Sequence, residues 1–480
     1  MTYAFTFDAS ACSGCKACQI ACKDKNNLPT GVLWRRVFEV SGGTWTQQDD
    51  AWTNNVFSYN LSIACNHCEH PKCAGVCPTD AYVTRADGIV YIDESKCMGC
   101  GYCSWACPYA APRYNPQLGH MTKCNFCMDN LDAGLPPACV AACPMRVLDF
   151  VTVGDGQQTT DDKPRTMGDG LSFVVNGQKL WEIPGTEHPF PLPPQSRTEP
   201  HLAIRPHAGM LNGLEKTVSN REEVKPPRSK VGRLWSPKSL ALGVEELPLL
   251  IFTLCGQTAA GMALFALFGG PLSIPLLTVI GGLIAVGGLA SFLHLGSPWN
   301  AWRALNHLNK SWLSREILAF GLFGASWLIA LALPGMGKLP LALTGLALVY
   351  VMAQVYHLRS MPSWNTWRTP VGFFATALVL GLTLMWNILG FETQWAGMMV
   401  AALLALELGG WLGAKSTASQ AIHNWRGGLI AAGILGAGIG SAAAGPAEAW
   451  TGLVVFLIVL AESILGRWEF YAALDERVLG

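Results

Sequence analysis

The chain has 480 residues, of which 50% are apolar and only 14% are charged, and its formal net charge is zero. Soluble domains carry roughly 25% charged residues, so this composition excludes an ordinary soluble enzyme, and the length exceeds that of one typical domain. The balanced charge gives no sign of a basic surface, and we expect no nucleic-acid partner.

Sixteen of the seventeen cysteines lie in the first 143 residues, in four runs of four. The first and third runs have the Cys-x2-Cys-x2-Cys-x3-Cys spacing that is typical of bacterial ferredoxins. A structural zinc site fits less well, because zinc favours paired Cys-x2-Cys units. Disulfides suit small secreted domains, and the Cys-x2-Cys-His motif that attaches haem covalently is absent. Sixteen thiolates therefore predict four [4Fe–4S] clusters, and the same sixteen cysteines are the predicted metal ligands.

The pairing of the runs follows from their order. In two-cluster ferredoxins, the fourth cysteine of one run binds the cluster of the other run. The second and third runs are neighbours, which favours an inner pair of clusters enclosed by an outer pair, in an α+β tandem ferredoxin-like domain over residues 1–150. The predicted ligand sets are Cys12, Cys15 and Cys18 with Cys143; Cys124, Cys127 and Cys139 with Cys22; Cys65, Cys68 and Cys73 with Cys107; and Cys97, Cys100 and Cys103 with Cys77.

Residues 151–236 form a segment rich in proline, glycine and charged residues, with little periodicity. It is either a disordered tether or an arm that lies along a partner subunit. Upstream of it, Arg35-Arg36 is not followed by an apolar region and a cleavage site, so we expect no export signal there.

The remainder, 237–480, reads as an all-α transmembrane bundle. A membrane-spanning helix needs roughly 20 apolar residues, and small residues such as those around Gly281 allow close helix packing. We expect eight spans in the lipid bilayer, at about 246–269, 272–294, 314–333, 339–357, 371–389, 394–413, 427–445 and 449–466.

Basic residues predict the orientation of this bundle. With eight spans, the turns after the second, fourth and sixth helices lie on the side of the cysteine domain, and the opposite turns carry only Lys338. The positive-inside bias then predicts a multi-pass protein of the inner membrane whose cysteine domain is cytoplasmic. The basic residues on that side are Arg303, Lys310, Arg315, Arg359, Arg368, Lys415, Arg426, Arg467 and Arg477.

A quinone site is expected where the second helix ends. Quinones exchange protons together with electrons, so the site needs a titratable group near water, and His294 and Glu316 are the best candidates. Arg303 and Arg315 are supporting candidates. In the alternative reading, His294 only caps a helix and Glu316 only pairs with Arg315 or Arg303.

Two further carboxylates fall inside predicted spans, where ionisable groups are costly and therefore suggest function. Glu407 and Glu462 would both line the channel if the protein were a quinone-coupled ion pump, and Glu462 could instead form an ion pair with Arg467. Gln257 is expected to form a hydrogen bond between helices. We expect no haem, because the histidines of this half fall at or beyond helix ends: His294, His307, His357 and His423.

Several stretches resemble the dimethyl sulfoxide reductase family. Residues 1–150 resemble its four-cluster iron–sulfur subunit and 246–471 its eight-helix membrane anchor, so the chain looks like a fusion of the two. The stretches are Ser62-Ile-Ala-Cys-Asn-His-Cys-Glu69, Gly119-His-Met-Thr-Lys-Cys124, Glu246-Leu-Pro-Leu-Leu-Ile-Phe-Thr253, Gly256-Gln257, His294-Leu-Gly-Ser-Pro298, Thr369-Pro-Val-Gly-Phe-Phe374, Gly466-Arg467 and Phe470-Tyr471.

The resemblance implies menaquinol as the electron donor, with His294 and Glu316 at quinol-site positions, and supports the nested cluster ligation. It also implies a separate molybdenum or tungsten bis-pterin catalytic subunit in anaerobic respiration, so that quinol chemistry is the only reaction on this chain. Three alternatives stay open: the reverse electron flow of a sulfite dehydrogenase-type complex, a quinone-coupled ion pump, and a transporter with a redox sensor.

Overall fold

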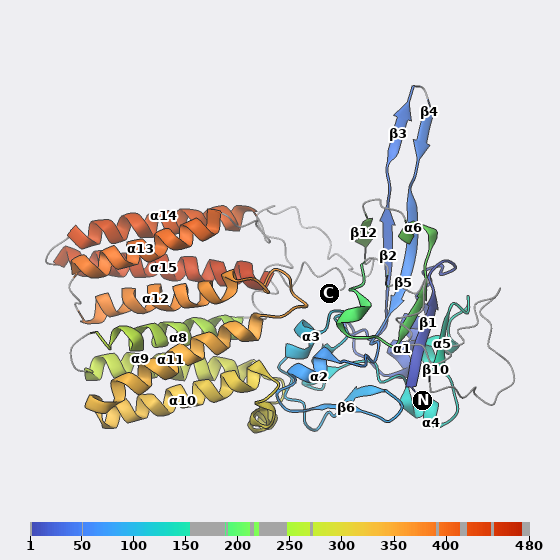
Figure 1. Cartoon of the computed structure of the whole chain (residues 1–480), viewed down its shortest axis with the longest axis horizontal. Coiled ribbons are helices and arrows are strands. Elements are labelled where there is room, and N and C mark those ends of the chain that lie inside the picture. Colours follow the sequence, from blue (N-terminus) through green and yellow to red (C-terminus); the bar gives the residue numbers. More distant parts are fainter. Residues whose placement is uncertain are drawn as a thin grey trace. The chain divides into compact units, whose positions relative to one another are not determined.

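The structure divides into two compact units, Met1–Lys230 with Val478–Gly480, and Val231–Arg477 (Figure 1). We call them the cysteine-rich unit and the helical unit. The computed structural model describes residues 2–49, 51–153, 188, 191–211, 216–219, 247–268, 272–389, 393–412, 420–442 and 446–472.

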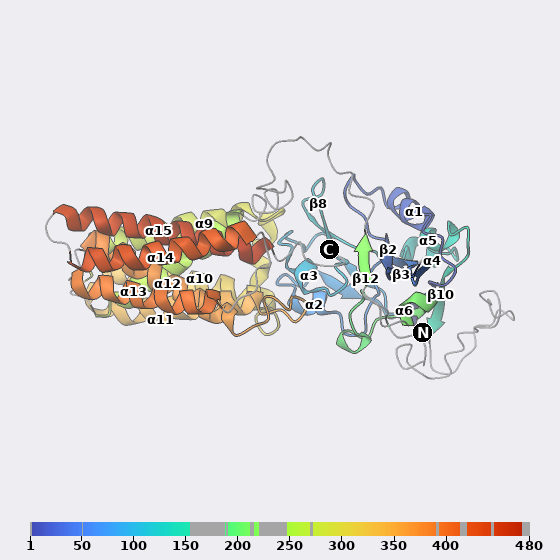
Figure 2. The same ribbon diagram turned by 90° about the horizontal axis from the view of Figure 1, so that it is seen from above.

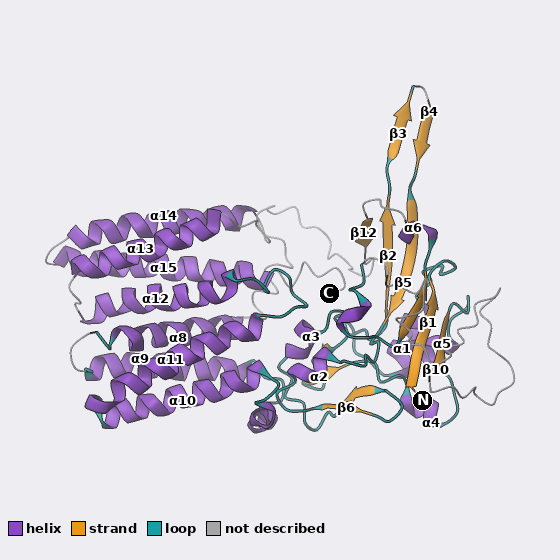
Figure 3. Cartoon of the chain, in the orientation of Figure 1, coloured by secondary structure: helices purple, strands orange, loops and turns teal. Residues whose placement is uncertain are grey.

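The cysteine-rich unit consists of short strands and short helices joined by loops (Figure 3). Its strands are β1 (Thr2–Asp8), β2 (Arg36–Gly42), β3 (Trp45–Gln48), β4 (Ala51–Asn54), β5 (Phe57–Ile63), β6 (Tyr82–Thr84), β7 (Val90–Ile92), β8 (Arg113–Asn115), β9 (His120–Thr122), β10 (Leu148–Val153), β11 (Leu202–Arg205) and β12 (Lys216–Ser219). Its helices are α1 (Ala17–Lys25), α2 (Lys72–Val76), α3 (Tyr102–Ala106), α4 (Met128–Asp132), α5 (Ala138–Ala141), the 3₁₀ helix η2 (Gln195–Arg197) and α6 (Ala208–Leu211).

Two three-stranded sheets support the loops that carry the cysteines. β1 lies between β10 and β11, and β2 lies between β12 and β5. The strands are rich in aromatic and β-branched residues, which favour a half-buried pleated surface. Their inward side chains, among them Phe5, Phe38, Tyr59 and Leu61, form the core together with several of the cysteines.

The strand order matches the nested arrangement of the cysteine runs. β1 precedes the first run and β10 follows the fourth, and the two pair antiparallel from Thr2↔Val153 to Phe7↔Leu148. The inner runs are associated with α2 and α3 and with the hairpins β6–β7 and β8–β9. The ends of this 150-residue segment are thus tied together around its middle.

Part of the segment after residue 150 is built into the sheets of the cysteine-rich unit. Within its described part, β11 pairs parallel to β1, from Phe5↔Leu202 to Asp8↔Arg205, and β12 pairs antiparallel to β2. These residues therefore belong to the cysteine-rich unit, whose bounds are Met1–Lys230 with Val478–Gly480. Such short strands form because they complete an existing sheet, which local sequence does not reveal.

The helical unit contains long helices that run alongside one another (Figures 1 and 2). They are α8 (Leu247–Phe265), α9 (Ile274–Leu293), α10 (Trp312–Ala332), α11 (Pro334–Tyr356), α12 (Arg368–Leu389), α13 (Thr393–Leu412), α14 (Gln420–Ala442) and α15 (Pro446–Ala472), with the 3₁₀ helix η3 (Pro298–His307) between α9 and α10.

Within the described residues, five helices are long and apolar enough to cross a membrane: Leu247–Phe265, Ile274–Leu293, Trp312–Ala332, Pro334–Tyr356 and Arg368–Asn387. α13 contains a shorter apolar stretch, Ala396–Leu408. The expected spans near 394–413, 427–445 and 449–466 overlap α13, α14 and α15, but the crossing of the membrane by these helices stays a prediction.

Glycines allow α8 and α12 to approach closely. A Cβ atom added to Gly261 would lie 1.8 Å from the carbonyl oxygen of Ala377, and one added to Gly381 would lie 2.5 Å from the carbonyl carbon of Gly261. Gln257 Nε2 also donates a hydrogen bond to Phe373 O across this contact (3.2 Å), which confirms its expected interhelical role.

Candidate functional site

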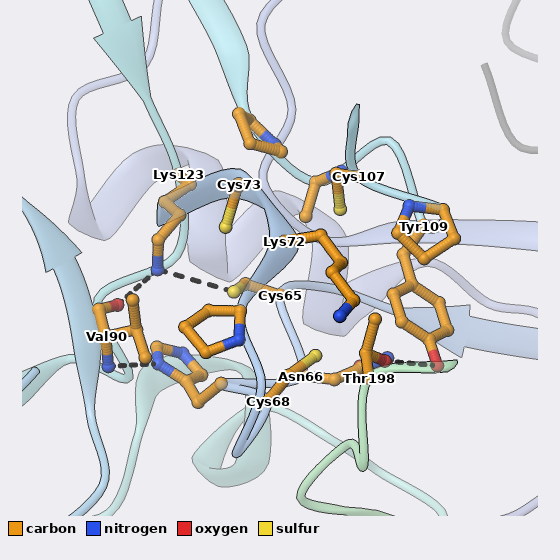
Figure 4. Close-up of a pocket in the computed structure, with 15 residues that line it drawn as sticks. Cys65, Asn66, Cys68, Lys72, Cys73, Val90, Cys107, Tyr109, Lys123 and Thr198 are labelled. Carbon is orange, nitrogen blue, oxygen red and sulfur yellow. Dashed lines mark hydrogen bonds between the residues drawn. The ribbon is translucent and has the colours of Figure 1, made fainter. Parts of the chain in front are cut away.

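The sixteen cysteines of the four runs come together in four groups. Two groups line cavities. Figure 4 shows the cavity lined by Cys65, Cys68, Cys73 and Cys107. In the other two groups the thiols are close enough to act electrostatically on one another. We call them site I (Cys12, Cys15, Cys18, Cys143), site II (Cys22, Cys124, Cys127, Cys139), site III (Cys65, Cys68, Cys73, Cys107) and site IV (Cys77, Cys97, Cys100, Cys103).

These groups coincide with the ligand sets predicted from the spacing, although ligation of iron stays a prediction. None of the seventeen cysteines, all within described residues, forms a disulfide. Cys255 is a half-buried thiol in α8, far in sequence from the others.

Tight loops bring the thiols of a run together. Gly14, between the first two cysteines of site I, has φ 68°, and an added Cβ would lie 2.5 Å from Asn60 Oδ1. Asn60 Nδ2 in turn donates to Cys12 O (3.2 Å). Gly99 and Gly101 adopt the same left-handed conformation in the third run. Glycine adopts positive φ without steric cost, so these loops can wrap around a central group.

Hydrogen-bond donors point at the sulfur atoms. Backbone N–H groups aimed at sulfur favour thiolate over thiol, as at iron–sulfur sites. The contacts are Ala81 N to Cys77 Sγ (3.4 Å), Ala111 N to Cys107 Sγ (3.5 Å), Phe126 N to Cys124 Sγ (3.4 Å), Asn26 Nδ2 to Cys22 Sγ (3.8 Å) and Lys123 Nζ to Cys65 Sγ (3.3 Å).

The electrostatics of the thiols also fit a metal cluster. Burial raises the pKa of Cys12 to about 11 and of Cys22 to about 12, and nearby thiols add to both shifts. Such thiols ionise only when a cation compensates the charge. Within the described residues, no three His, Cys, Asp or Glu side chains converge tightly enough to hold one metal ion.

His294 and Glu316 lie at the same end of the helical bundle. His294 is the C-cap residue of α9, where its backbone N–H donates to Ala290 O, and its side chain is half-buried. Glu316 lies five residues into α10, after the Ser311 N-cap, and is 5% exposed. His294 therefore occupies the helix-capping position that the alternative reading expected.

The two supporting arginines make other contacts. Arg315 donates to the carbonyl oxygens of Leu308 (2.8 Å) and Asn309 (2.9 Å), so it closes the loop between η3 and α10. Arg303 lies over the Trp302 ring, 5.0 Å from its centroid, and its Nε is buried without a hydrogen-bond partner in the described residues. Within the described residues, neither arginine forms an ion pair with Glu316.

Sequence reasoning missed a tyrosine pair beside Glu316. The hydroxyls of Tyr356 and Tyr471 lie 2.7 Å apart. Glu316, Arg467 and Tyr471 all act electrostatically on Tyr356. Arg467 is 6% exposed and stacks over Phe373, 3.6 Å from the ring centroid. Arg467 and Tyr471 lie in the short stretches that resemble the family's membrane anchor. This resemblance was the only signal in the sequence that could have identified them.

Glu407 and Glu462 belong to a buried ion network on α13, α14 and α15. Arg426 contacts Glu462 (2.6 Å), Glu407 (3.0 Å) and Glu469 (3.5 Å). Glu469 also contacts His423 Nδ1 (3.1 Å). The ion-pair partner of Glu462 is therefore Arg426 on the neighbouring helix, and not the Arg467 considered from the sequence, because residues on packed helices meet more closely than their numbers suggest.

A cysteine-rich unit of ferredoxin type, followed by a helical unit with membrane-spanning helices, defines a membrane-anchored electron-transfer protein. Sequence comparisons agree. The family described as "4Fe-4S dicluster domain" matches residues 56–153, and the family described as "DMSO reductase anchor subunit (DmsC)" matches residues 240–424.

Individual relatives match the N-terminal half. A component of the anaerobic dimethyl sulfoxide reductase of Escherichia coli K12 is 44% identical over 224 residues, which are 46% of this chain and 98% of the relative. The same component of the Haemophilus influenzae enzyme is 43% identical over 225 residues, with the same coverage. The thiosulfate reductase electron transfer subunit PhsB of Salmonella typhi is 43% identical over 149 residues, 31% of this chain and 74% of the relative.

The chain belongs to the dimethyl sulfoxide reductase family and joins its iron–sulfur subunit and its membrane anchor in one polypeptide. It is an electron-transfer subunit and anchor of a reductase-type complex that includes a catalytic partner subunit.

Proposed function

We propose that this chain carries electrons between menaquinol, which it oxidises, and a separate molybdenum or tungsten bis-pterin catalytic subunit, like that of dimethyl sulfoxide reductase. The observation that supports this most directly is the convergence of sixteen cysteines into four sets of four, with N–H donors on the sulfurs. Sites I–IV would each hold a [4Fe–4S] cluster, which supplies one-electron transfer when bound.

The proposed quinol site is at the end of the bundle that carries η3. Oxidation of a quinol releases two protons, so the chain has to supply a base within reach of water. Glu316 is a buried carboxylate with the Tyr356 hydroxyl nearby, and His294 is half-buried at the end of α9. In this proposal Glu316 accepts the proton of the quinol hydroxyl and His294 orients the headgroup and exchanges protons with water.

We propose eight spans and a cytoplasmic cysteine-rich unit, as the basic residues predict. The substrate of the catalytic subunit stays open. A complex of the sulfite dehydrogenase type, which would feed electrons into quinone, uses the same path in the opposite direction.

The quinol site can be tested by substituting its two residues. Glu316→Gln and His294→Ala should each lower quinol-driven cluster reduction by about 10²-fold or more, because loss of a general base costs about 10²–10⁴-fold. The measurement is stopped-flow bleaching of the iron–sulfur absorbance after a menaquinol analogue is added.

A matched control is Lys338→Gln, which changes a charge near the N-terminal end of α11, the end opposite Tyr356. It should leave the rate unchanged, and all variants should keep sixteen irons per chain. Unaltered rates in both site variants would remove these residues from the quinol site. Far fewer than sixteen irons in the unsubstituted protein would contradict the four-cluster assignment itself.

A second candidate function is a quinone-coupled ion pump. It is favoured by the buried network in which Glu407, Glu462 and Glu469 share the guanidinium of Arg426. Buried carboxylates in excess over cations are typical of proton paths in membranes. The assembled complex in vesicles should then move more than the one proton per electron that quinol oxidation releases, and Glu407→Gln should abolish the excess. A ratio of one in the unsubstituted complex excludes pumping.

A further inference from the structure

Lys123 is a buried cation between two cysteine sites. It is 3% exposed, directly precedes Cys124 of site II, and donates from Nζ to Cys65 Sγ of site III (3.3 Å; Figure 4). Its other acceptors are the carbonyl oxygens of Val90 and Cys124 (3.1 Å for the latter). No carboxylate in the described residues pairs with it, and the charges that act on it are those of cysteines at sites II and III.

Arg35 occupies the corresponding place between sites I and II. It is 2% exposed and lies over the Phe5 ring, 4.6 Å from the centroid. Nη1 donates to the carbonyl and the hydroxyl of Ser62 (3.2 Å each), and Ser62 Oγ lies 3.3 Å from Cys18 Sγ. Nε and Nη2 are buried without a hydrogen-bond partner in the described residues. The cysteines that act on Arg35 are Cys139, Cys18, Cys124 and Cys22.

A buried cation without negative charge nearby is strongly destabilising. Four thiolates at each site provide that charge, and neither cation has a carboxylate in the described residues to provide it instead. Between sites III and IV the buried polar group is different: the Tyr82 hydroxyl, which is neutral and lies among Cys103, Cys73 and Cys77. Arg35 and Lys123 are therefore placed at two of the junctions, one between sites I and II and one between sites II and III.

We propose that Arg35 and Lys123 tune the reduction potentials of the sites they share: Arg35 raises those of sites I and II, and Lys123 raises those of sites II and III. A cation stabilises the reduced, more negative form of a cluster, and net charge and hydrogen bonds to sulfur are recognised determinants of the potential. Site II lies beside both Arg35 and Lys123, so its reduction potential should depend on both charges. The proposal rests on the proposed function, because it requires clusters in the four sites.

The test compares charge removal at these positions in the full-length protein with its clusters. Lys123→Met should shift two clusters to more negative potentials in an EPR-monitored redox titration, and Arg35→Met should shift two as well, with one cluster common to both pairs. Lys123→Arg, which keeps the charge, should shift them much less. Lys123→Gln keeps a donor for Cys65 Sγ without the charge, and it should shift the potentials nearly as far as Lys123→Met.

Lys72 provides the matched control, because it lines the same cavity as site III but is exposed to water. Lys72→Met removes an equal charge that solvent already screens, so the potentials should stay in place. Unchanged potentials in Lys123→Gln and Arg35→Met, with sixteen irons retained, would overturn the inference and leave the proposed function intact. A shortage of iron in the unsubstituted protein would instead contradict the proposed function.

Discussion

Cys143 and Cys12 lie at opposite ends of the cysteine-rich sequence but line the same cavity. The predicted exchange of fourth ligands would use this proximity, because three cysteines in a tight loop leave one corner of a cluster to a residue from elsewhere. The partners that determine the charge around the sites could not be foreseen in the same way. Arg35 and Lys123 look like ordinary surface residues in the sequence, and their burial results from packing of distant segments.

The crossed arrangement predicts which single substitutions act on the same cluster. Cys143→Ser should change the EPR signal that Cys15→Ser changes, and Cys22→Ser the one that Cys139→Ser changes, because each pair belongs to one site. The measurement is EPR spectroscopy of the reduced variants. An effect of Cys143→Ser on the signal that Cys139→Ser affects would show instead that the fourth run binds its cluster with all four of its own cysteines.

At the scale of elements, the contact between α8 and α12 depends on small residues. Hydropathy predicted both helices because long apolar runs are a strong signal. It could not predict that Gly261 lies against Ala377, since which faces meet depends on the packing of the bundle. The same limit explains β11: four residues of ordinary composition become a strand because β1 offers a free edge.

Gly261→Leu should destabilise the helical unit. The new side chain would begin 1.8 Å from the Ala377 carbonyl oxygen, and overpacking of this kind costs about 1–3 kcal/mol or more. Thermal unfolding of the detergent-solubilised protein, followed by circular dichroism, measures the loss.

Gly321→Leu on α10 is the control, because an added Cβ at Gly321 meets nothing within 4 Å. Its midpoint should equal or exceed that of the unsubstituted chain, since leucine favours a helix over glycine by almost 1 kcal/mol. Equal losses in both variants would mean that the glycine contact is not what holds α8 against α12.

For the whole molecule, the sequence predicted the two-part organisation and the membrane anchor, and the comparisons confirm both. The sequence did not indicate that part of the segment after residue 150 adds strands to sheets whose other strands come much earlier. The ion pairs among α13, α14 and α15 could not be predicted from the sequence either. The partner of a charged residue in an apolar helix depends on how the helices pack in the bundle. Quinol chemistry and the orientation in the membrane stay predictions that rest on residue type and charge.

The pairing of β1 with β10 has a consequence for the timing of biosynthesis. Sites III and IV have all their thiols once residue 107 has left the ribosome, whereas sites I and II need cysteines as far as residues 143 and 139. All cysteines of sites III and IV, the inner pair, are therefore synthesised before the last cysteines of sites I and II, the outer pair. An iron-donating machinery that works on the nascent chain meets the inner pair first, and a chain truncated after residue 130 would retain complete thiol sets only there.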